Sequence, residues 1–243
     1  MSDSQNTYPG ISALSLTKYH ELGYHIEPDI WLPEEQEEIL EAAKNLPTAH
    51  NGTFHITQNP HLKDDLKWIV SNPKIVAIME QLLGGRLNAI QSQFFFVPPA
   101  AIGYTAHQDN FYVQSYRDSF ASAWSAMEDV DPENGGLYIY PRSHLEEILP
   151  VADTDIIKNA SYNDIHVTHQ SSVLPEGRYQ KLDLFIPRGS VVFIHGHLVH
   201  GSYPNTSHDR FRRSLLVTYL RQGAPFRKGR DNKRQITNCY DAR

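Results

Sequence analysis

The residue pattern of this chain changes near residue 86, and that change limits the folds it can adopt. Before it, apolar residues recur at helical spacing, and proline or glycine marks the ends of several segments. Helices are expected at Leu16–Leu22, Pro33–Leu46, Leu62–Val70 and Pro73–Leu83, with a brief strand at Tyr24–Ile26. After it, aromatic and branched residues alternate with turn residues. Strands are expected at Leu87–Val97, Phe120–Val130, Leu137–Tyr140, Ser190–His195 and Ser214–Arg221.

A helical first part followed by many short strands predicts an α+β chain whose core is a β-sandwich or a double-stranded β-helix. The 243 residues fit a single domain, with a mainly helical part at 1–85, a β core at 86–221 and a basic tail at 222–243. Residues 150–182 are polar and weakly patterned, which predicts an insertion or lid. Asn134-Gly135-Gly136 predicts a hairpin turn, and Ser143 is expected to cap a short helix with Glu146.

Composition argues against several classes of partner. The net charge of −6 lacks the basic excess that nucleic-acid binding uses. No segment approaches the roughly 20 apolar residues of a membrane span, and Met1–Gly10 lacks the apolar run of a signal peptide. Cys239 is the only cysteine, which suits a reducing compartment. We therefore expect a cytoplasmic protein with no nucleic-acid or membrane partner; the sequence leaves the oligomeric state open.

An imidazole and a carboxylate lie two residues apart in His107-Gln108-Asp109. On an extended segment, alternate side chains project to the same side, so both groups can bind one metal ion. A third ligand from a distant strand would complete a set of two histidines and one carboxylate. That set leaves coordination positions open and is typical of non-haem Fe(II) oxygenases. The tripeptide alone is a weak signal, because such short sequences recur by chance.

A second histidine-rich segment follows a buried strand far downstream. His195, His197 and His200 compete there for the role of third ligand. Arg212 and Arg213 come shortly afterwards. An arginine suits the binding of an acidic cosubstrate, because its planar guanidinium can hold a carboxylate by two hydrogen bonds. Since side chains alternate along a strand, only one of the two arginines can face inward.

Several short segments are specific as a set and span about Leu87 to Arg221. They are Gln91-Ser92, His107-Gln108-Asp109-Asn110, Ala123-Trp124, Asn134-Gly135-Gly136-Leu137, Pro141-Arg142-Ser143-His144, and His200-Gly201-Ser202 with the arginines after it. With these segments the chain resembles the phytanoyl-CoA dioxygenase (PhyH) family of Fe(II)- and 2-oxoglutarate-dependent oxygenases. Arg142 is a departure, since many members have glycine there, but that turn lies off the metal face.

The resemblance implies a double-stranded β-helix, that is, a cupin-like jelly roll, with the N-terminal helices packed outside. It also implies that His107, Asp109 and His200 are the iron ligands. His195 then matches a histidine that is not a ligand, and His197 is expected to be a surface or lid contact.

The same resemblance assigns cosubstrate contacts. Arg212 matches the residue that binds the far carboxylate of 2-oxoglutarate, with Arg213 as its rival. Ser202, Gln91 and Trp124 are further candidates for that pocket. Their alternatives are a turn hydroxyl, a solvent-facing strand residue and a core tryptophan, respectively. Asn110 is a candidate substrate contact, with a local hydrogen bond in its loop as the alternative.

The activity that the resemblance implies is hydroxylation with O2, during which 2-oxoglutarate is converted to succinate and CO2. Related halogenases have a small residue where this chain has Asp109, so hydroxylation is expected. A group of basic residues near the C-terminus suits a small polar or anionic substrate, although a solvated tail would look the same. These residues are Arg221, Arg227, Lys228, Arg230, Lys233 and Arg234. The resemblance adds organophosphonates as an example, because some family members oxidise them.

Two rival functions remain open. One is a non-catalytic jelly roll that binds a metal or a small acid. The other is a cupin-type dioxygenase that does not use 2-oxoglutarate, and the position of Arg212 after the His-Gly-Ser turn counts against it.

Overall fold

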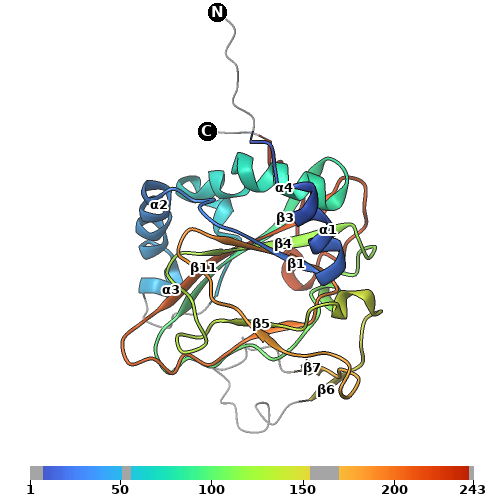
Figure 1. Ribbon diagram of the computed structural model, residues 1–243. Coiled ribbons are helices and arrows are strands. Elements are labelled where there is room, and N and C mark those ends of the chain that lie inside the picture. Colours follow the sequence, from blue (N-terminus) through green and yellow to red (C-terminus); the bar gives the residue numbers. More distant parts are fainter. Residues whose placement is uncertain (1–7, 51–55, 154–169, 241–243) are drawn as a thin grey trace, which may run out of the picture.

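The computed structural model describes residues 8–50, 56–153 and 170–240, and two antiparallel sheets face each other in it (Figure 1). The strand order is β1-β9-β4-β11-β3-β2 in the larger sheet and β10-β5-β8 in the smaller sheet. The larger sheet comprises β1 (Tyr24–Glu27), β2 (Thr57–Gln58), β3 (Leu87–Val97), β4 (Phe120–Ala126), β9 (Val191–His195) and β11 (Arg212–Arg221). The smaller sheet comprises β5 (Leu137–Ile139), β8 (Leu182–Asp183) and β10 (His200–Ser202), and β6 (Val151–Asp153) pairs with β7 (Gln170–Ser172).

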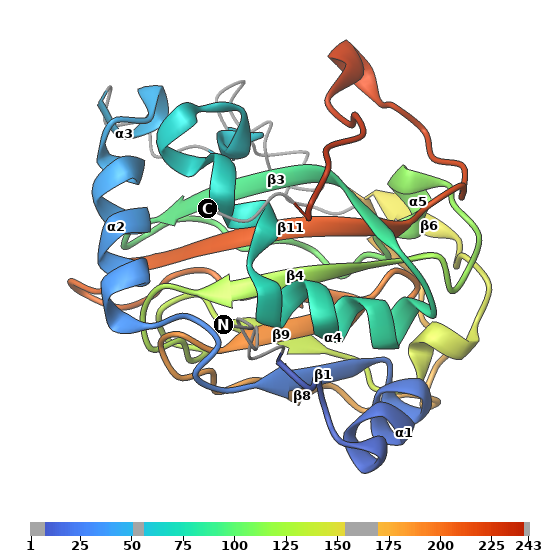
Figure 2. The same cartoon turned by 90° about the horizontal axis from the view of Figure 1, so that it is seen from above.

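Helices cover the outer face of the larger sheet, and Figure 2 shows α4 crossing it and α2 beside it. The α-helices are α1 (Ala13–Leu22), α2 (Pro33–Lys44), α3 (Pro47–His50), α4 (Pro73–Leu83) and α5 (Asn110–Val113). Short 3-10 helices lie at η1 (Pro60–Leu62), η2 (Asp64–Ser71), η3 (Ser143–Leu145) and η5 (Arg230–Asn232). This arrangement is the predicted double-stranded β-helix with helices outside. No helix in the described part is long and apolar enough to cross a bilayer.

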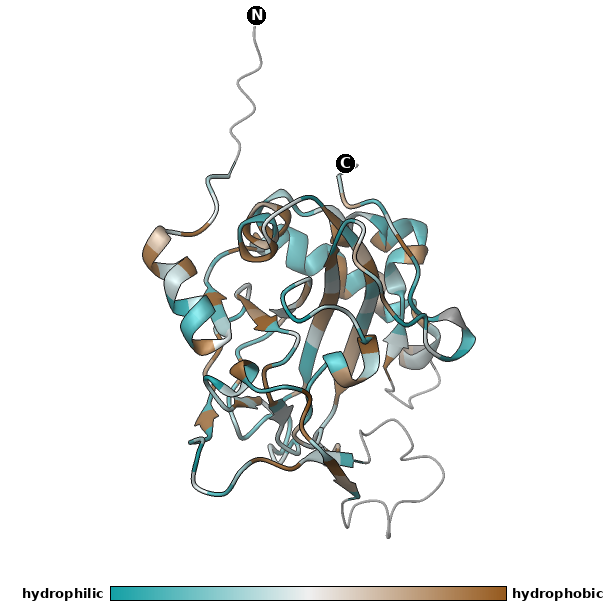
Figure 3. Ribbon diagram, turned by 90° about the vertical axis from the view of Figure 1, so that its right-hand side faces the viewer, coloured by the Kyte–Doolittle hydropathy of each residue, from teal (hydrophilic) through white to brown (hydrophobic). Residues whose placement is uncertain are grey.

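The period-two pattern of β3 explains how the larger sheet separates two cores. Phe94 and Phe96 belong to the apolar cluster under the helices, whereas Phe95 and Val97 belong to the cluster between the sheets. Successive side chains of a strand point to opposite faces, so one strand contributes to both clusters. The apolar colours of Figure 3 accordingly concentrate on the strands in the middle of the molecule.

The ends of α4 follow directly from its flanking residues. Asn72 accepts hydrogen bonds from the backbone N–H groups of Lys74 and Ile75, at 3.0 and 3.2 Å. Gly84 ends the helix in the left-handed conformation, with φ of +67°. A capping asparagine satisfies backbone donors that have no partner inside the helix, and glycine adopts positive φ without strain. The predicted bounds of this helix are confirmed.

Three local predictions are wrong. The segment expected as a helix at Leu62–Val70 forms two 3-10 helices, because the backbone of Lys63 is extended and separates them. The strand expected at Phe120–Val130 ends at Ala126. Ser143 caps no helix: its hydroxyl accepts a hydrogen bond from the backbone N–H of Val199 at 2.8 Å.

The prediction of a basic tail at 222–243 needs correction for residues 222–240, which pack against the body. Thr237 forms a bridge with Ala89 of β3, and both Arg234 and Cys239 are buried. Of the predicted insertion or lid at 150–182, residues 154–169 lie outside the described residues.

Candidate metal centre

A backbone bridge places the two histidines of the site side by side. The N–H of His107 donates to the carbonyl of His200 at 2.8 Å, and the N–H of His200 donates back at 3.0 Å. His200 is the first residue of β10, and His107 precedes α5. Their ring centroids are 4.4 Å apart. The pairing of two segments far apart in sequence therefore brings the imidazoles together.

Each imidazole is oriented by its own segment. The Nδ1 of His107 donates to the carbonyl of Thr105 at 2.8 Å, and the Nδ1 of His200 donates to the carbonyl of Leu198 at 3.0 Å. A hydrogen bond at one ring nitrogen fixes the tautomer and leaves the other nitrogen available as a ligand. Both Nε2 atoms are therefore free to bind a metal ion.

Asp109 joins the histidines through a turn. Its backbone is helical, with φ of −57° and ψ of −33°, where α5 begins. The expectation of an extended segment is wrong at this residue, yet the carboxylate still reaches His107, with Oδ1 at 3.6 Å from Nε2. The Ser122 hydroxyl of β4 donates to the other carboxylate oxygen, Oδ2, at 2.9 Å. Oδ1 thus remains available as a ligand atom.

The geometry and the protonation states fit a divalent cation. One ligand atom from each of His107, Asp109 and His200 lies within 4.8 Å of the other two. Burial and repulsion from His107 lower the pKa of His200 to about 4, so this imidazole is neutral at pH 7. Burial raises the pKa of Asp109, but the interaction with His107 and the charge of His200 outweigh it and hold the pKa below its usual range. Metal ligands must be deprotonated in this way.

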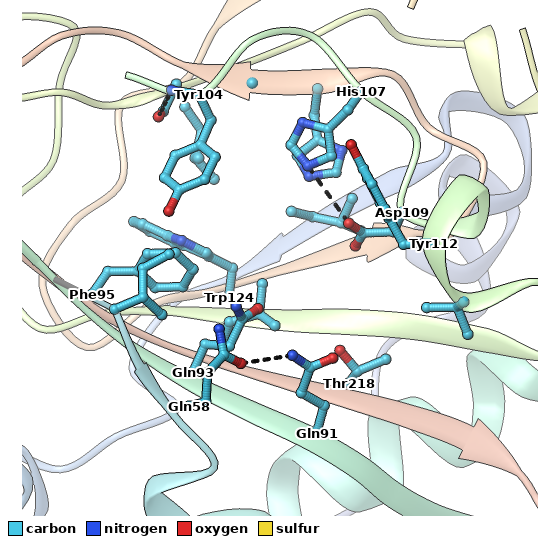
Figure 4. A pocket seen from close by; sticks show the side chains of 18 of the residues that line it. Gln58, Gln91, Gln93, Phe95, Tyr104, His107, Asp109, Tyr112, Trp124 and Thr218 are labelled. Atoms are coloured by element: carbon cyan, nitrogen blue, oxygen red, sulfur yellow. Dashed lines mark hydrogen bonds and ion pairs between the residues drawn. The ribbon is translucent and has the colours of Figure 1, made fainter. Parts of the chain in front are cut away.

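The three side chains line a cavity of about 300 Å³ (Figure 4). Phe95, Tyr104 and Trp124 form an aromatic side of it. Gln91 lies at its floor, where its amide donates to Gln58 at 2.9 Å. Polar and charged side chains thus converge on a concave pocket beside an aromatic wall, and such convergence is a feature of small-molecule sites.

Arg212 lines the same cavity and is only 2% exposed. Its Nε donates to the carbonyl of Gly135 at 3.1 Å, and its Nη1 donates to the hydroxyl of Ser214 at 3.0 Å. Burial lowers the pKa of Arg212 to about 10, which leaves it charged at pH 7. No carboxylate among the described residues forms an ion pair with it. A buried cation with hydrogen-bonding capacity to spare suits the carboxylate of a ligand.

Arg213 faces the other way. Its Nε donates to Glu128 at 2.7 Å, and the two side chains form an ion pair. Alternation along β11 therefore places Arg212, and not Arg213, against the cavity.

The remaining sequence-predicted residues fall into two groups. Gln91, Trp124 and Ser202 line the cavity, and the Ser202 hydroxyl also accepts a hydrogen bond from the backbone of Tyr104 at 3.0 Å. Gln91 is buried and does not face solvent. Trp124 also belongs to the apolar cluster between the sheets.

Asn110 and His197 contact each other and do not line the cavity. The Asn110 amide donates to His197 Nε2 at 2.7 Å and to the carbonyl of Ser115 at 3.0 Å. The alternative of a local hydrogen bond in the loop therefore describes Asn110. His197 is 3% exposed, so the expectation of a surface residue is wrong, and the alternative of a lid contact stays a prediction. His195 pairs with Asp118 at 3.0 Å, outside the metal cluster.

Sequence reasoning missed several residues of the cavity. They are Gln58, Gln93, Tyr104, Tyr112 and Thr218, whereas Lys233 and Arg234 were named only as members of the basic group near the C-terminus. For Gln93 a signal was present, because Gln91 and Gln93 are alternate polar residues in a strand otherwise rich in apolar ones. Tyr104 and Tyr112 each lie three residues from a predicted metal ligand, and for Gln58 and Thr218 no local pattern marks the side chain.

Comparisons with known proteins concern the family and the fold of the chain. A model of the phytanoyl-CoA dioxygenase (PhyH) family matches residues 10–214. The chain is 30% identical over 134 residues to "Phytanoyl-CoA dioxygenase 1" of Oryza sativa subsp. japonica. That match covers 55% of this chain and 45% of the rice protein. The chain thus spans less than half of that relative. It is 24% identical over 228 residues to a "Probable alpha-ketoglutarate-dependent hypophosphite dioxygenase" of Stutzerimonas stutzeri. That match covers 83% of this chain and 76% of the relative.

Solved structures confirm the fold. The non-heme alpha ketoglutarate dependent carbocyclase SnoK from nogalamycin biosynthesis matches with a TM-score of 0.74 at 21% identity. The match covers 93% of this chain and 90% of the SnoK chain. The epimerase SnoN, in complex with Fe3+, alpha ketoglutarate and nogalamycin RO, has a TM-score of 0.72 at 21% identity, covering 88% and 85%. Because the family model spans most of the sequence, the chain belongs to the phytanoyl-CoA dioxygenase family, which consists of Fe(II)- and 2-oxoglutarate-dependent oxygenases.

Proposed function

We propose that this protein is an Fe(II)- and 2-oxoglutarate-dependent dioxygenase that hydroxylates a small, polar or anionic organic molecule. The observation that carries the proposal is the presence, in one cavity, of the His107, Asp109 and His200 cluster and the buried guanidinium of Arg212. A metal-binding protein without turnover needs no cation beside its metal. A dioxygenase that does not use a 2-oxo acid has no use for Arg212 in this position.

His107, Asp109 and His200 would hold the iron, and Arg212 would bind the far carboxylate of 2-oxoglutarate, with Ser202 and Gln91 as further polar contacts. When bound, Fe(II) and 2-oxoglutarate supply the activation of O2, with release of succinate and CO2. The chain orients the reactants and excludes water. The Ser122 hydroxyl holds Asp109 in place from behind the site.

The proposed substrate is small because the cavity is small. At about 300 Å³ it lies at the lower limit of usual ligand pockets, and it must hold both 2-oxoglutarate and the substrate. Hydroxylation is proposed over halogenation because Asp109 is present as a carboxylate ligand. A relative that matches 83% of this chain is named for hypophosphite, which supports small phosphorus oxyanions and organophosphonates as first candidates.

Anaerobic titration of the Fe(II) protein with 2-oxoglutarate tests the cosubstrate site. Chelation of the 2-oxo acid at the iron should produce a charge-transfer absorption in the visible spectrum. The Arg212→Gln variant should need at least about tenfold more 2-oxoglutarate to reach half of the full absorption, because a charge-assisted pair is lost. Arg213→Gln is the matched control and should titrate as the wild type does, because Arg213 pairs with Glu128 away from the cavity.

Admission of O2 then tests turnover. Succinate should form from 2-oxoglutarate and increase with a productive substrate. An absorption band without succinate, across the candidate substrates, would favour a non-catalytic binder. Absence of the band itself would reject the use of 2-oxoglutarate.

A further inference from the structure

The C-terminal segment, residues 228–237, is bound to the edge of the cavity by backbone hydrogen bonds. Gln235 N donates to the carbonyl of Ile90 at 3.0 Å, and Thr237 exchanges two hydrogen bonds with Ala89, at 2.8 and 3.0 Å. The Asn59 amide donates to the carbonyl of Lys233 at 2.7 Å. The segment is therefore held against β3 and η1 at defined positions.

This segment brings two cations into the cavity that contains the metal cluster. Lys233 and Arg234 both line it. Arg234 is 5% exposed, and its Nη1 donates to the carbonyls of Tyr112 and Arg227, at 3.3 and 3.2 Å. Neither side chain has a carboxylate partner in the described part of the chain. The Nε of Arg234 is buried there without any acceptor.

Both side chains lie close to Gly229. Its φ is +78°, which favours glycine. A Cβ at this position would lie 3.0 Å from Arg234 Nη1 and 3.2 Å from carbon atoms of Lys233. The backbone at Gly229 thus packs directly against the two cationic side chains, which limits their freedom.

Two unpaired cations so close together are costly unless an anion joins them. Burial lowers the pKa of Lys233, and the charge of Arg234 lowers it further. Burial also lowers the pKa of Arg234, an effect that the charge of Asp109 partly offsets. An anionic ligand would supply the missing partner.

Arg212 and the pair formed by Lys233 and Arg234 belong to segments that pair with opposite ends of β3. Arg212 pairs with Val97 at one end, and the C-terminal segment pairs with Ala89 and Ile90 near the other. A residue of strand advances about 3.3 Å, so these attachment points are well separated. One anion at Arg212 therefore leaves Lys233 and Arg234 without a partner.

We propose that Lys233 and Arg234 form an anion-binding subsite that holds the oxyanion group of the substrate, a carboxylate or a phosphonate, while 2-oxoglutarate occupies Arg212. The inference rests on the proposed function and names the substrate class for it. It also gives the C-terminal segment a role, because this segment supplies both cations.

Calorimetric titration of the full chain tests the subsite directly. The protein is held with Fe(II) and saturating 2-oxoglutarate without O2, so that Arg212 is occupied. Propionate and methylphosphonate are the anionic probes, and propionamide is the neutral isostere of propionate. We expect saturable binding of an anionic probe and much weaker binding of propionamide. The preferred probe distinguishes a carboxylate subsite from a phosphonate subsite.

Variants of the segment separate the subsite from general electrostatics. Lys233→Gln and Arg234→Gln should each weaken anion binding about 10- to 100-fold, as expected for a lost charge-assisted hydrogen bond, and Arg234→Lys should recover part of the loss. Lys228→Gln and Arg230→Gln remove the same charge at exposed positions of the same segment, and binding should be unchanged. If Arg234→Gln does not fold, Lys233→Gln carries the test, because the Lys233 ammonium makes no hydrogen bond within the described residues.

The subsite would be rejected if no probe bound the wild type, if propionamide matched propionate, or if Lys233→Gln bound anions as the wild type does. The absorption band of 2-oxoglutarate is recorded in the same samples. A normal band without anion binding rejects the subsite alone, whereas a missing band rejects the proposed function. In that second case, the titration is repeated in the Arg212→Gln variant, where only the subsite can bind the probes.

Discussion

Hydrogen bonds behind the metal cluster hold its side chains in position. The carbonyls of Thr105 and Leu198 each accept from the Nδ1 of an imidazole two residues later, and Ser122 donates to Asp109. The sequence indicated His107 and Asp109 because their spacing is itself a pattern. It gave no sign of Ser122, because a serine in a buried strand looks the same whether or not it contacts a carboxylate.

At this scale we predict that Ser122→Ala lowers metal affinity about 10- to 100-fold, since outer hydrogen-bond partners orient a ligand and tune its charge. Titration of the metal-free protein with Fe(II) under anaerobic conditions measures the metal affinity. Ser125→Ala, on the same strand, removes the acceptor of the Trp31 indole N–H instead. It should lower the melting temperature without changing metal affinity. Equal loss of affinity in both variants would contradict the prediction.

At the scale of elements, the turn between β4 and β5 orients Arg212. Gly135 supplies the carbonyl that accepts from Arg212 Nε. Gly136 donates to the carbonyl of Asp131 at 2.8 Å, so the turn is closed tightly. Sequence reasoning predicted the turn from its Asn-Gly-Gly run. It could not predict the contact with Arg212, because the partner lies in a strand far downstream.

We predict that Gly136→Ala destabilises the protein by about 1–3 kcal/mol, the usual cost of overpacking, and weakens 2-oxoglutarate binding. A Cβ at Gly136 would lie 2.5 Å from the Asp131 carbonyl oxygen, so the turn must shift. Thermal melting and the anaerobic titration measure the two effects. Gly85→Ala is the control, since its Cβ would meet only the Arg221 side chain, at 3.5 Å. Normal stability of Gly136→Ala would contradict the prediction.

At the scale of the whole molecule, folding buries histidines in several places. Burial is the main cause that lowers the pKa of His61, His144 and His200, each to about 4. His61 joins three parts of the fold, because its ring contacts the hydroxyls of Ser92 in β3 and Thr237 in the C-terminal segment. The folded state therefore favours neutral imidazoles.

This burial predicts an acid-sensitive fold for the metal-free protein. Above the unfolded pKa of about 6.5 the stability is fully present. As the pH falls from 6.5 toward 4, the unfolded chain binds protons that the folded chain does not, and stability is lost at about 1.4 kcal/mol per pH unit for each group. Urea unfolding at a series of pH values should show this fall. His61→Gln should make it less steep, and His208→Gln, at an exposed position, is the control. Equal slopes for wild type and His61→Gln would contradict the prediction.

The segments with strong local periodicity were predicted well, because neighbouring residues determine them. The bounds of α4 and β3 follow from caps, glycines and alternation within each segment. Segments that depend on distant contacts were predicted less well. The helix expected at Leu62–Val70 became 3-10 turns, and the basic stretch after β11, for which a solvated tail was the favoured interpretation, packs against β3.

The sequence by itself determined the order of helices and strands, the family, and the residue types available to bind a metal and an acid. Only the tertiary structure decided which candidate side chains enter the cavity: Arg212, Gln91, Lys233 and Arg234 line it, whereas Arg213 and Asn110 do not. The reason is physical. Spacing along a chain determines which side chains share a face, but the direction of that face depends on packing against residues remote in sequence.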